Sequence, residues 1–238
     1  MLSYKRLVII EGNIGVGKST LANDLSIYLG KDTKVFLEPD EKENKNPYLK
    51  RFYEDRKRYA FTMQCHLLAQ RLKAYEEAQW TVLNDKAHCI SDRSLWGDVS
   101  FSYCQVDDGS MTEEEFATYC SLFQIMTARI LYPHFAIKLI ATPKECLTRI
   151  NNRLSEREGR KCESKIELSY LEKLDNEINN VLNMLEKQGT IVIPIEWNYA
   201  LEDIEDRKNK IKNIASQILE TTPRSGVIDL HKIHRKIL

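Results

Sequence analysis

The stretch "EGNIGVGKST" at residues 11–20 constrains the fold more than any other part of this chain. It fits the pattern G-x-x-x-x-G-K-[ST], in which backbone amides surround phosphate oxygens. The apolar run "RLVII" (6–10) precedes it, and a helical pattern follows at about 18–29. This order of strand, loop and helix is the setting in which the pattern holds a nucleoside triphosphate. We therefore expect a P-loop inside an α/β domain.

The residues of this loop have distinct expected roles. Its glycines would let the amides turn toward the phosphates, and Lys18 would reach the β- and γ-phosphates. The hydroxyl of Ser19 would ligate Mg²⁺. The expected nucleotide-binding residues are Gly12, Asn13, Gly15, Val16, Gly17, Lys18, Ser19 and Thr20.

Four further β-branched runs follow the first one: "KVFLE" (34–38), "HCISD" (88–92), "FAIKLIA" (135–141) and "TIVIPI" (190–195). Helical patterns separate or follow them at about 48–82, 112–131, 143–154, 166–187 and 201–219. Such alternation predicts a five-stranded parallel sheet flanked by helices. At 238 residues we expect one domain over residues 1–220, followed by a tail at 221–238 to which we assign no function.

Charge and composition exclude several classes of partner. The chain carries 35 basic and 35 acidic residues, which argues against nucleic acid or an anionic membrane as a partner. No apolar run approaches the roughly 20 residues of a membrane span, and the first strand begins too early for a signal peptide. The six cysteines form no C-x-x-C pair and no zinc pattern. We expect reduced thiols and a cytoplasmic protein.

Charged residues stand where two of the expected strands end. The second strand ends at Glu38, and the third ends at Asp92 and Arg93. Ligands of parallel α/β sheets bind at the carboxyl ends of the strands, so these side chains should face the same crevice as the P-loop. A strand-end carboxylate can also be a helix cap or a solvated group, and for Glu38 both interpretations stay open.

Arginines recur at intervals of four in "RINNRLSEREGR". On a continuous helix, Arg149, Arg153 and Arg157 would project from one face. This face could be solvated and paired with nearby glutamates, or it could belong to a lid over the triphosphate at about 149–165. We favour the lid, because the segment follows the fourth strand of a P-loop fold, where lids that close over the triphosphate are often placed. Lid arginines would stabilise charge on a transferring phosphoryl group.

Two observations limit which molecule can accept the phosphate: the motifs of GTPases and ATPases that are missing from the sequence, and the presence of Glu38. The chain has neither the N-K-x-D nor the D-x-x-G of a GTPase, and "IVIPIEW" is a poor match to an ATPase strand ending in Asp-Glu. Transfer to a small molecule remains. A sugar hydroxyl must lose a proton as it attacks, so a positioned carboxylate such as Glu38 favours a nucleoside over a nucleotide as acceptor.

Seven segments occur in an order that resembles the deoxynucleoside kinase family. They are "EGNIGVGKST", "LEPD", "NPYLKRFYED", "MQCHLLAQR", "DRSLWGD", "RINNRLSERE" and "YLEKL", and "NPYL" with "FYED" is most similar to the bacterial deoxyadenosine and deoxyguanosine kinases. The resemblance implies a P-loop kinase fold with a helical lid, ATP or a similar triphosphate as phosphate donor, Mg²⁺, and a homodimer. It also implies a deoxynucleoside whose 5′-hydroxyl accepts the phosphate.

The resemblance also implies roles for the strand-end residues. Glu38 would be the general base for the 5′-hydroxyl, and Arg93 would steady both that base and the phosphate. Asp92 would lie near the metal. Lys18 and the lid arginines would complete the catalytic set.

Further residues would bind the nucleoside by the same resemblance. Gln64 would read the base through its side-chain amide. Arg71 and Asp98 match a charged pair that the family places beside the base in members accepting adenine, guanine or cytosine nucleosides. Tyr53 would bond the 3′-hydroxyl together with a lid glutamate, which by simple alignment is Glu158.

The chain departs from the family pattern in two places. Ser155 stands where the lid commonly has its third arginine, and extra residues after Glu158 leave Glu163 as an alternative contact to the sugar. The aromatic side chain that stacks on the base aligns with Ser102, so we assign the stacking to the neighbouring Phe101.

The resulting hypothesis is a deoxynucleoside kinase with a purine deoxynucleoside as first choice of substrate and deoxycytidine as second. A thymidylate-type nucleotide kinase is the alternative among enzymes, because such kinases also carry a P-loop and an Asp-Arg pair. A nucleotide-binding regulatory module without catalysis is the alternative from another class.

Overall fold

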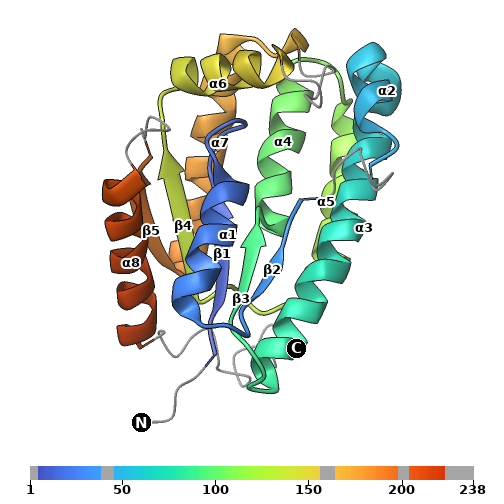
Figure 1. Ribbon diagram of the computed structural model, residues 1–238. Coiled ribbons are helices and arrows are strands. Elements are labelled where there is room, and N and C mark those ends of the chain that lie inside the picture. Colours follow the sequence, from blue (N-terminus) through green and yellow to red (C-terminus); the bar gives the residue numbers. More distant parts are fainter. Residues whose placement is uncertain (1–4, 39–45, 156–163, 198–203, 223–238) are drawn as a thin grey trace.

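The computed structural model describes residues 5–38, 46–155, 164–197 and 204–222. Its centre is one sheet with helices on both faces (Figure 1). The strands are β1 (Leu7–Glu11), β2 (Lys34–Phe36), β3 (Cys89–Asp92), β4 (Phe135–Ile140) and β5 (Ile191–Glu196). All four strand pairings are parallel, which confirms the expected five-stranded parallel sheet.

The strand order β2-β3-β1-β4-β5 determines where a ligand can bind. Ile10 of β1 is level with Asp92 of β3 and with Ile137 of β4, so these strands end at one edge of the sheet. From β1 the chain crosses toward β2, whereas from β3 it crosses to β4 on the opposite side of β1. The crossovers diverge between β1 and β3, and this is the position at which open α/β sheets bind ligands.

Alternate side chains of β1 supply the two halves of the core. Val8 and Ile10 pack on one face with helices α1 (Lys18–Leu29) and α8 (Ile204–Glu220). Leu7 and Ile9 pack on the other face with α3 (Arg56–Leu83), α4 (Leu95–Asp107) and α7 (Leu168–Lys187). Successive strand residues point to opposite faces, so a strand covered on both faces is apolar throughout.

Helix α4 is absent from the sequence expectations, although two predicted site residues lie on it. Its segment reads "LWGDVSFSYCQVD", and its buried positions include Asp98, Ser100, Ser102 and Gln105. These polar side chains interrupt the apolar repeat by which an amphipathic helix is recognised. Ser94 caps the start of the helix, because its hydroxyl accepts a hydrogen bond from the Gly97 amide at 3.1 Å.

The helix expected at 48–82 is instead two helices, α2 (Leu49–Glu54) and α3. Asp55 separates them with an extended backbone (φ −142°), and its carboxylate caps α3 by accepting from the Arg58 amide at 3.1 Å. Helix α5 (Glu113–Thr127) is shorter than the expected 112–131, and Thr112 and Glu115 form a capping box at its start.

The remaining helical expectations are close to the structure, where α6 (Pro143–Ser155) lies across the carboxyl edge of the sheet (Figure 1). Pro194, which weakened "IVIPIEW" as an ATPase strand, lies on β5 at an edge of the sheet, the position where proline is tolerated. Among the helices that the structure describes, none is long and apolar enough to cross a bilayer.

Strand β1 ends in a carboxylate that is packed against α4. Glu11 is fully buried, and a Cβ added at Gly97 would lie 2.5 Å from its Oε1 atom. Real Cβ atoms essentially never come within 3.0 Å of another heavy atom. The Glu11 carboxylate cannot easily move away, because it is held by Ser94 and Arg93. Position 97 therefore requires glycine for space.

We expect Gly97→Ala to destabilise the protein by about 1–3 kcal/mol, the usual cost of overpacking. At an unconstrained helical position the same substitution stabilises the protein by roughly 0.5–1 kcal/mol. The expected change in the free energy of unfolding at position 97 therefore has the opposite sign. Urea unfolding measures the difference, and an unchanged m-value would show that both proteins unfold in the same way. A stability equal to or above that of the wild type would contradict the close packing.

Candidate active site

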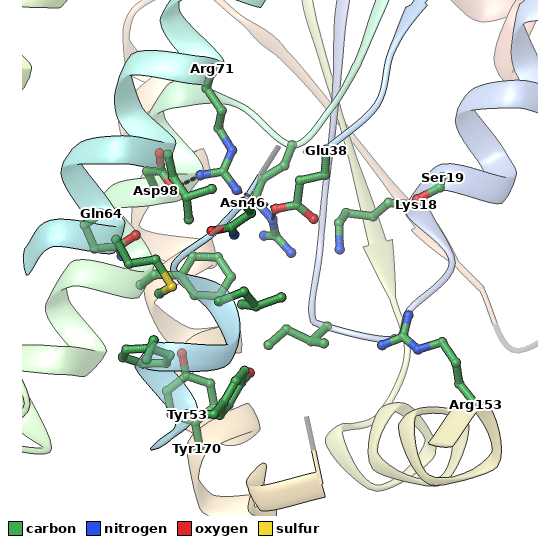
Figure 2. A pocket seen from close by; sticks show the side chains of 18 of the residues that line it. Lys18, Ser19, Glu38, Asn46, Tyr53, Gln64, Arg71, Asp98, Arg153 and Tyr170 are labelled. Carbon is green, nitrogen blue, oxygen red and sulfur yellow. Dashed lines mark hydrogen bonds and ion pairs between the residues drawn. The ribbon is translucent and has the colours of Figure 1, made fainter. Parts of the chain in front are cut away.

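A cavity of about 380 Å³ opens at the carboxyl edge of the sheet. Figure 2 shows Lys18, Glu38, Gln64 and Arg153 pointing into it from the P-loop, the end of β2, α3 and α6. The predicted site residues that line it are Gly15, Gly17, Lys18, Ser19, Thr20, Glu38, Tyr53, Gln64, Arg71, Arg93, Asp98, Phe101, Arg149 and Arg153. Residues from distant parts of the chain therefore meet in one cavity.

The P-loop has left-handed backbone conformations at its glycines. Gly12 and Gly17 have φ of 149° and 105°, and a Cβ at Gly17 would lie 2.9 Å from the indole nitrogen of Trp197. Two other loop side chains hold the loop in place. Val16 is buried in the core, and Asn13 Nδ2 donates to the Leu171 carbonyl at 2.8 Å. Their contribution to a phosphate is thus limited to their backbone amides.

Lys18 lies at the mouth of the loop. Its Nζ donates to the carbonyls of Asn13 at 2.9 Å and Gly12 at 3.4 Å. Burial, and then the nearby charge of Arg93, lower the pKa of Lys18 to about 8. The negative charge of a phosphate beside it would favour its protonated form.

Ser19 and Asp92 form a pair that fits Mg²⁺. The Ser19 hydroxyl donates to Asp92 Oδ2 at 2.5 Å, while Asp92 Oδ1 is buried and has no hydrogen-bond partner among the described residues. Burial raises the pKa of Asp92, so a nearby cation would favour its charged form. The described residues contain no cluster of three or more metal-ligating side chains. Mg²⁺ needs none, because water and phosphates supply most of its ligands.

Glu38 follows β2, which ends two residues earlier than expected, at Phe36. Its Oε1 accepts from Arg93 Nε at 3.1 Å and also from Arg71 Nη2. The Glu38 side chain is 24% exposed, against 1% for Arg93 and 8% for Arg71. The carboxylate therefore lies between two buried cations and the cavity.

Arg93 is held on three sides. Besides Glu38, its Nη1 is 3.4 Å from Glu11 Oε2, and its guanidinium lies over the ring of Phe101 at 4.6 Å. Its backbone is left-handed (φ 72°), an uncommon conformation for a residue with a side chain. Since Arg93 covers the ring of Phe101, this contact competes for the ring with the predicted stacking on a base.

Glu11 is a site residue that the sequence reasoning missed. Its Oε1 accepts from both the amide and the hydroxyl of Ser94, at 2.8 and 2.6 Å. Burial raises the pKa of Glu11, and the charge of Arg93 opposes the rise. The available signal was a charged residue at the end of an apolar strand, directly before the P-loop. Asn46, Gln105 and Tyr170 also line the cavity and were missed.

Arg71 joins two parts of the site. It forms an ion pair with Asp98 on α4, where both side chains are buried, and it also reaches Glu38. Gln64 lies two turns away on the same helix, and both of its buried amide atoms are without a partner in the described residues. The predicted base-binding residues thus lie together, and one of them contacts the predicted general base.

The arginines of the expected lid differ in position. Arg149 donates to the carbonyls of Val16 and Trp197, each at 3.0 Å, and so braces the P-loop against the end of β5. Arg153 reaches into the cavity on the side of Lys18 (Figure 2). Arg157, Glu158 and Glu163 lie outside the described residues.

Comparison with known proteins gives consistent matches along most of the chain. The family model "Deoxynucleoside kinase" matches residues 8–222. A deoxyguanosine kinase of Dictyostelium discoideum is 36% identical over 89% of this chain and 70% of its own length. A deoxyadenosine/deoxycytidine kinase of Bacillus subtilis is 32% identical over 89% of this chain and 91% of its own length.

Solved structures agree with the sequence matches. The deoxyadenosine kinase from M. mycoides with bound dATP superposes with a TM-score of 0.69 at 25% identity, covering 87% of this chain and 98% of that one. The same kinase with the products dCMP and dCDP gives a TM-score of 0.70, covering 89% and 99%. The chain has the P-loop kinase fold, is a nucleoside kinase, and belongs to the deoxynucleoside kinase family.

Proposed function

We propose that this protein transfers the γ-phosphate of ATP to the 5′-hydroxyl of a deoxynucleoside, with a purine favoured and deoxycytidine as second choice. One observation carries the proposal: Glu38 lies at the cavity between Lys18 of the P-loop and the pocket of Gln64, Arg71 and Asp98. A carboxylate in this position lies between the phosphate donor and the acceptor, where it can take the proton that the acceptor must lose.

The described side chains divide the reaction among them. Glu38 accepts the proton of the 5′-hydroxyl as the bond from the hydroxyl oxygen to the γ-phosphorus forms. The bond from that phosphorus to the β-phosphate oxygen breaks, and ADP leaves. Arg93 holds Glu38 in place, and Lys18 and Arg153 stabilise the charge on the transferring group. Ser19 and Asp92 would hold Mg²⁺, which supplies charge neutralisation at the phosphates.

Substrate contacts follow from the same cavity. Gln64 would bind the base, Arg71 and Asp98 would exclude thymine, and Tyr53 would bond the 3′-hydroxyl. Residues 149–165 would act as the lid, and a lid glutamate would meet the sugar. The structures with dATP and with dCMP and dCDP support a site for nucleotides in the family.

A homodimer in the cytoplasm completes the proposal. Large apolar side chains are exposed on α4 and α5, among them Tyr103 at 47% and Ile125 at 75%. Exposed apolar side chains mark a surface that packs against a partner when they form one contiguous patch. Five cysteines in the described residues are free thiols, which agrees with a reducing compartment.

A substrate panel tests the activity directly. We expect purified protein with ATP and Mg²⁺ to phosphorylate deoxyadenosine or deoxyguanosine at the 5′ position, with deoxycytidine next, as measured by separation of labelled products. Phosphorylation of monophosphates alone would indicate the thymidylate-type nucleotide kinase instead. Absence of turnover with every common nucleoside and monophosphate would indicate the regulatory module. The comparisons favour neither alternative.

For the mechanism, we expect Glu38→Gln to lower kcat by about 10²-fold or more, because the amide cannot accept the proton. Calorimetric titration with the nucleoside should show binding that survives. Glu38→Asp is the matched control, since it keeps a base but withdraws it, and its kcat should fall between the two. Near-normal turnover of the glutamine variant would remove Glu38 as the base.

For base selection, we expect Arg71→Met combined with Asp98→Ala to admit thymidine. The overall kcat should fall as well, because Arg71 also donates to Glu38. The ion pair of Arg56 with Asp108, at 3.0 Å, lies outside the cavity and provides the control when neutralised in the same way. Relative kcat/KM values for four deoxynucleosides report the outcome, and selectivity like that of the wild type would count against the Arg71–Asp98 pair.

A further inference from the structure

Helices α3 and α4 present matching rows of polar residues to the cavity. On α3, Gln64 and Arg71 are seven residues apart, and on α4, Asp98 and Gln105 are also seven apart. Seven residues are two helical turns, or about 10.5 Å, and they bring both side chains to one face. All four residues line the cavity.

The ion pair of Arg71 with Asp98 fixes how these two rows align. Figure 1 shows α3 running away from α2 and α4 running in the opposite direction from the end of β3. Because the two helices are antiparallel, the start of α3 and the end of α4 lie in the same direction from this ion pair. Gln64 lies two turns from Arg71 in that direction, and Gln105 lies two turns from Asp98 in the same direction. Gln105 is therefore level with Gln64 along the two helices, and both residues line the cavity.

Both glutamines are buried without hydrogen-bond partners. Gln64 and Gln105 are each 0% exposed, and neither Nε2 nor Oε1 of either side chain has a partner among the described residues. Leaving a buried polar group unpaired costs about 1–3 kcal/mol. Two unpaired amides that line one cavity indicate a ligand that carries its own donors and acceptors.

Lack of a partner alone would not identify a binding residue. Ser100 on the same helix is also fully buried with an unpaired hydroxyl, but it does not line the cavity. Gln105 has both properties. Its backbone carbonyl accepts from the Met111 amide at 2.9 Å, and this bond does not depend on the side chain. The role of the amide can thus be separated from the role of the residue in the fold.

We propose that Gln105 is a second base-reading residue, which binds the edge of a purine that Gln64 leaves unbound. This inference rests on the proposed function and narrows its acceptor. A side-chain amide offers one acceptor and two donors, and it pairs with two adjacent groups on a base. A purine carries N1 and the exocyclic group at position 6 on its six-membered ring and the acceptor N7 on its five-membered ring, so it can engage two amides on different edges.

The test combines protein variants with substrates that lack single groups. Gln105→Leu keeps the approximate volume and removes the amide. The substrates are the preferred purine deoxynucleoside, its 7-deaza analogue and its analogue without the exocyclic group at position 6. In the wild type, each deletion should lower kcat/KM about 10-fold, as expected for the loss of one good contact. Gln105→Leu should be insensitive to one deletion, and Gln64→Leu to the other.

The controls separate base reading from a general effect on the fold. Ser100→Ala should keep both sensitivities of the wild type. Gln105→Asn, which withdraws the amide by one methylene, should lose part of the sensitivity, and it replaces the leucine variant if that variant does not fold. A uniform loss for all substrates, or unchanged sensitivity, would overturn the inference. Failure of the wild type to phosphorylate any deoxynucleoside would instead overturn the proposed function.

Discussion

The buried chain of charges through Glu38 is the interaction on which the site depends. It runs from Glu11 to Arg93, from Arg93 to Glu38, and through Arg71 to Asp98. Each member comes from a different element: β1, the residues after β3, the residues after β2, α3 and α4. Loss of one partner from a buried ion pair costs about 3–5 kcal/mol, because the other charge stays buried. Correct packing of these five elements and correct placement of the Glu38 carboxylate, the proposed general base, therefore depend on the same contacts.

This chain also links the two ends of the substrate site. Arg71 contacts the predicted base-binding Asp98 and the carboxylate that would receive the proton. A base that shifts Arg71 would shift a hydrogen bond to Glu38. The choice of base can thus change kcat as well as the affinity for the nucleoside. An effect on affinity alone would be uniform binding, whereas an effect on kcat requires that the contact differs in the transition state.

Local patterns made the sheet, the P-loop and the strand-end residues predictable. An apolar run before a glycine-rich loop specifies its own structure, and parallel strands bring Glu38, Asp92 and Arg93 to one edge by topology alone. Helix α4 could not be recognised, because the polar residues that make it part of the site remove its apolar repeat. Glu11 and Gln105 were missed because their importance comes from burial, which depends on elements far away in the sequence. The break between α2 and α3 was missed because it depends on the non-helical backbone of a single residue, Asp55.

The left-handed backbone of Arg93 has a consequence for how this protein can be engineered. A non-glycine residue in that region costs of the order of 1–3 kcal/mol, and glycine would relieve it. A search for thermostable variants that considers only backbone strain would choose glycine at position 93. That choice would remove the guanidinium that holds Glu38. The same substitution would leave the buried Glu11 without its cation, and that loss, about 3–5 kcal/mol, exceeds the backbone strain that glycine relieves.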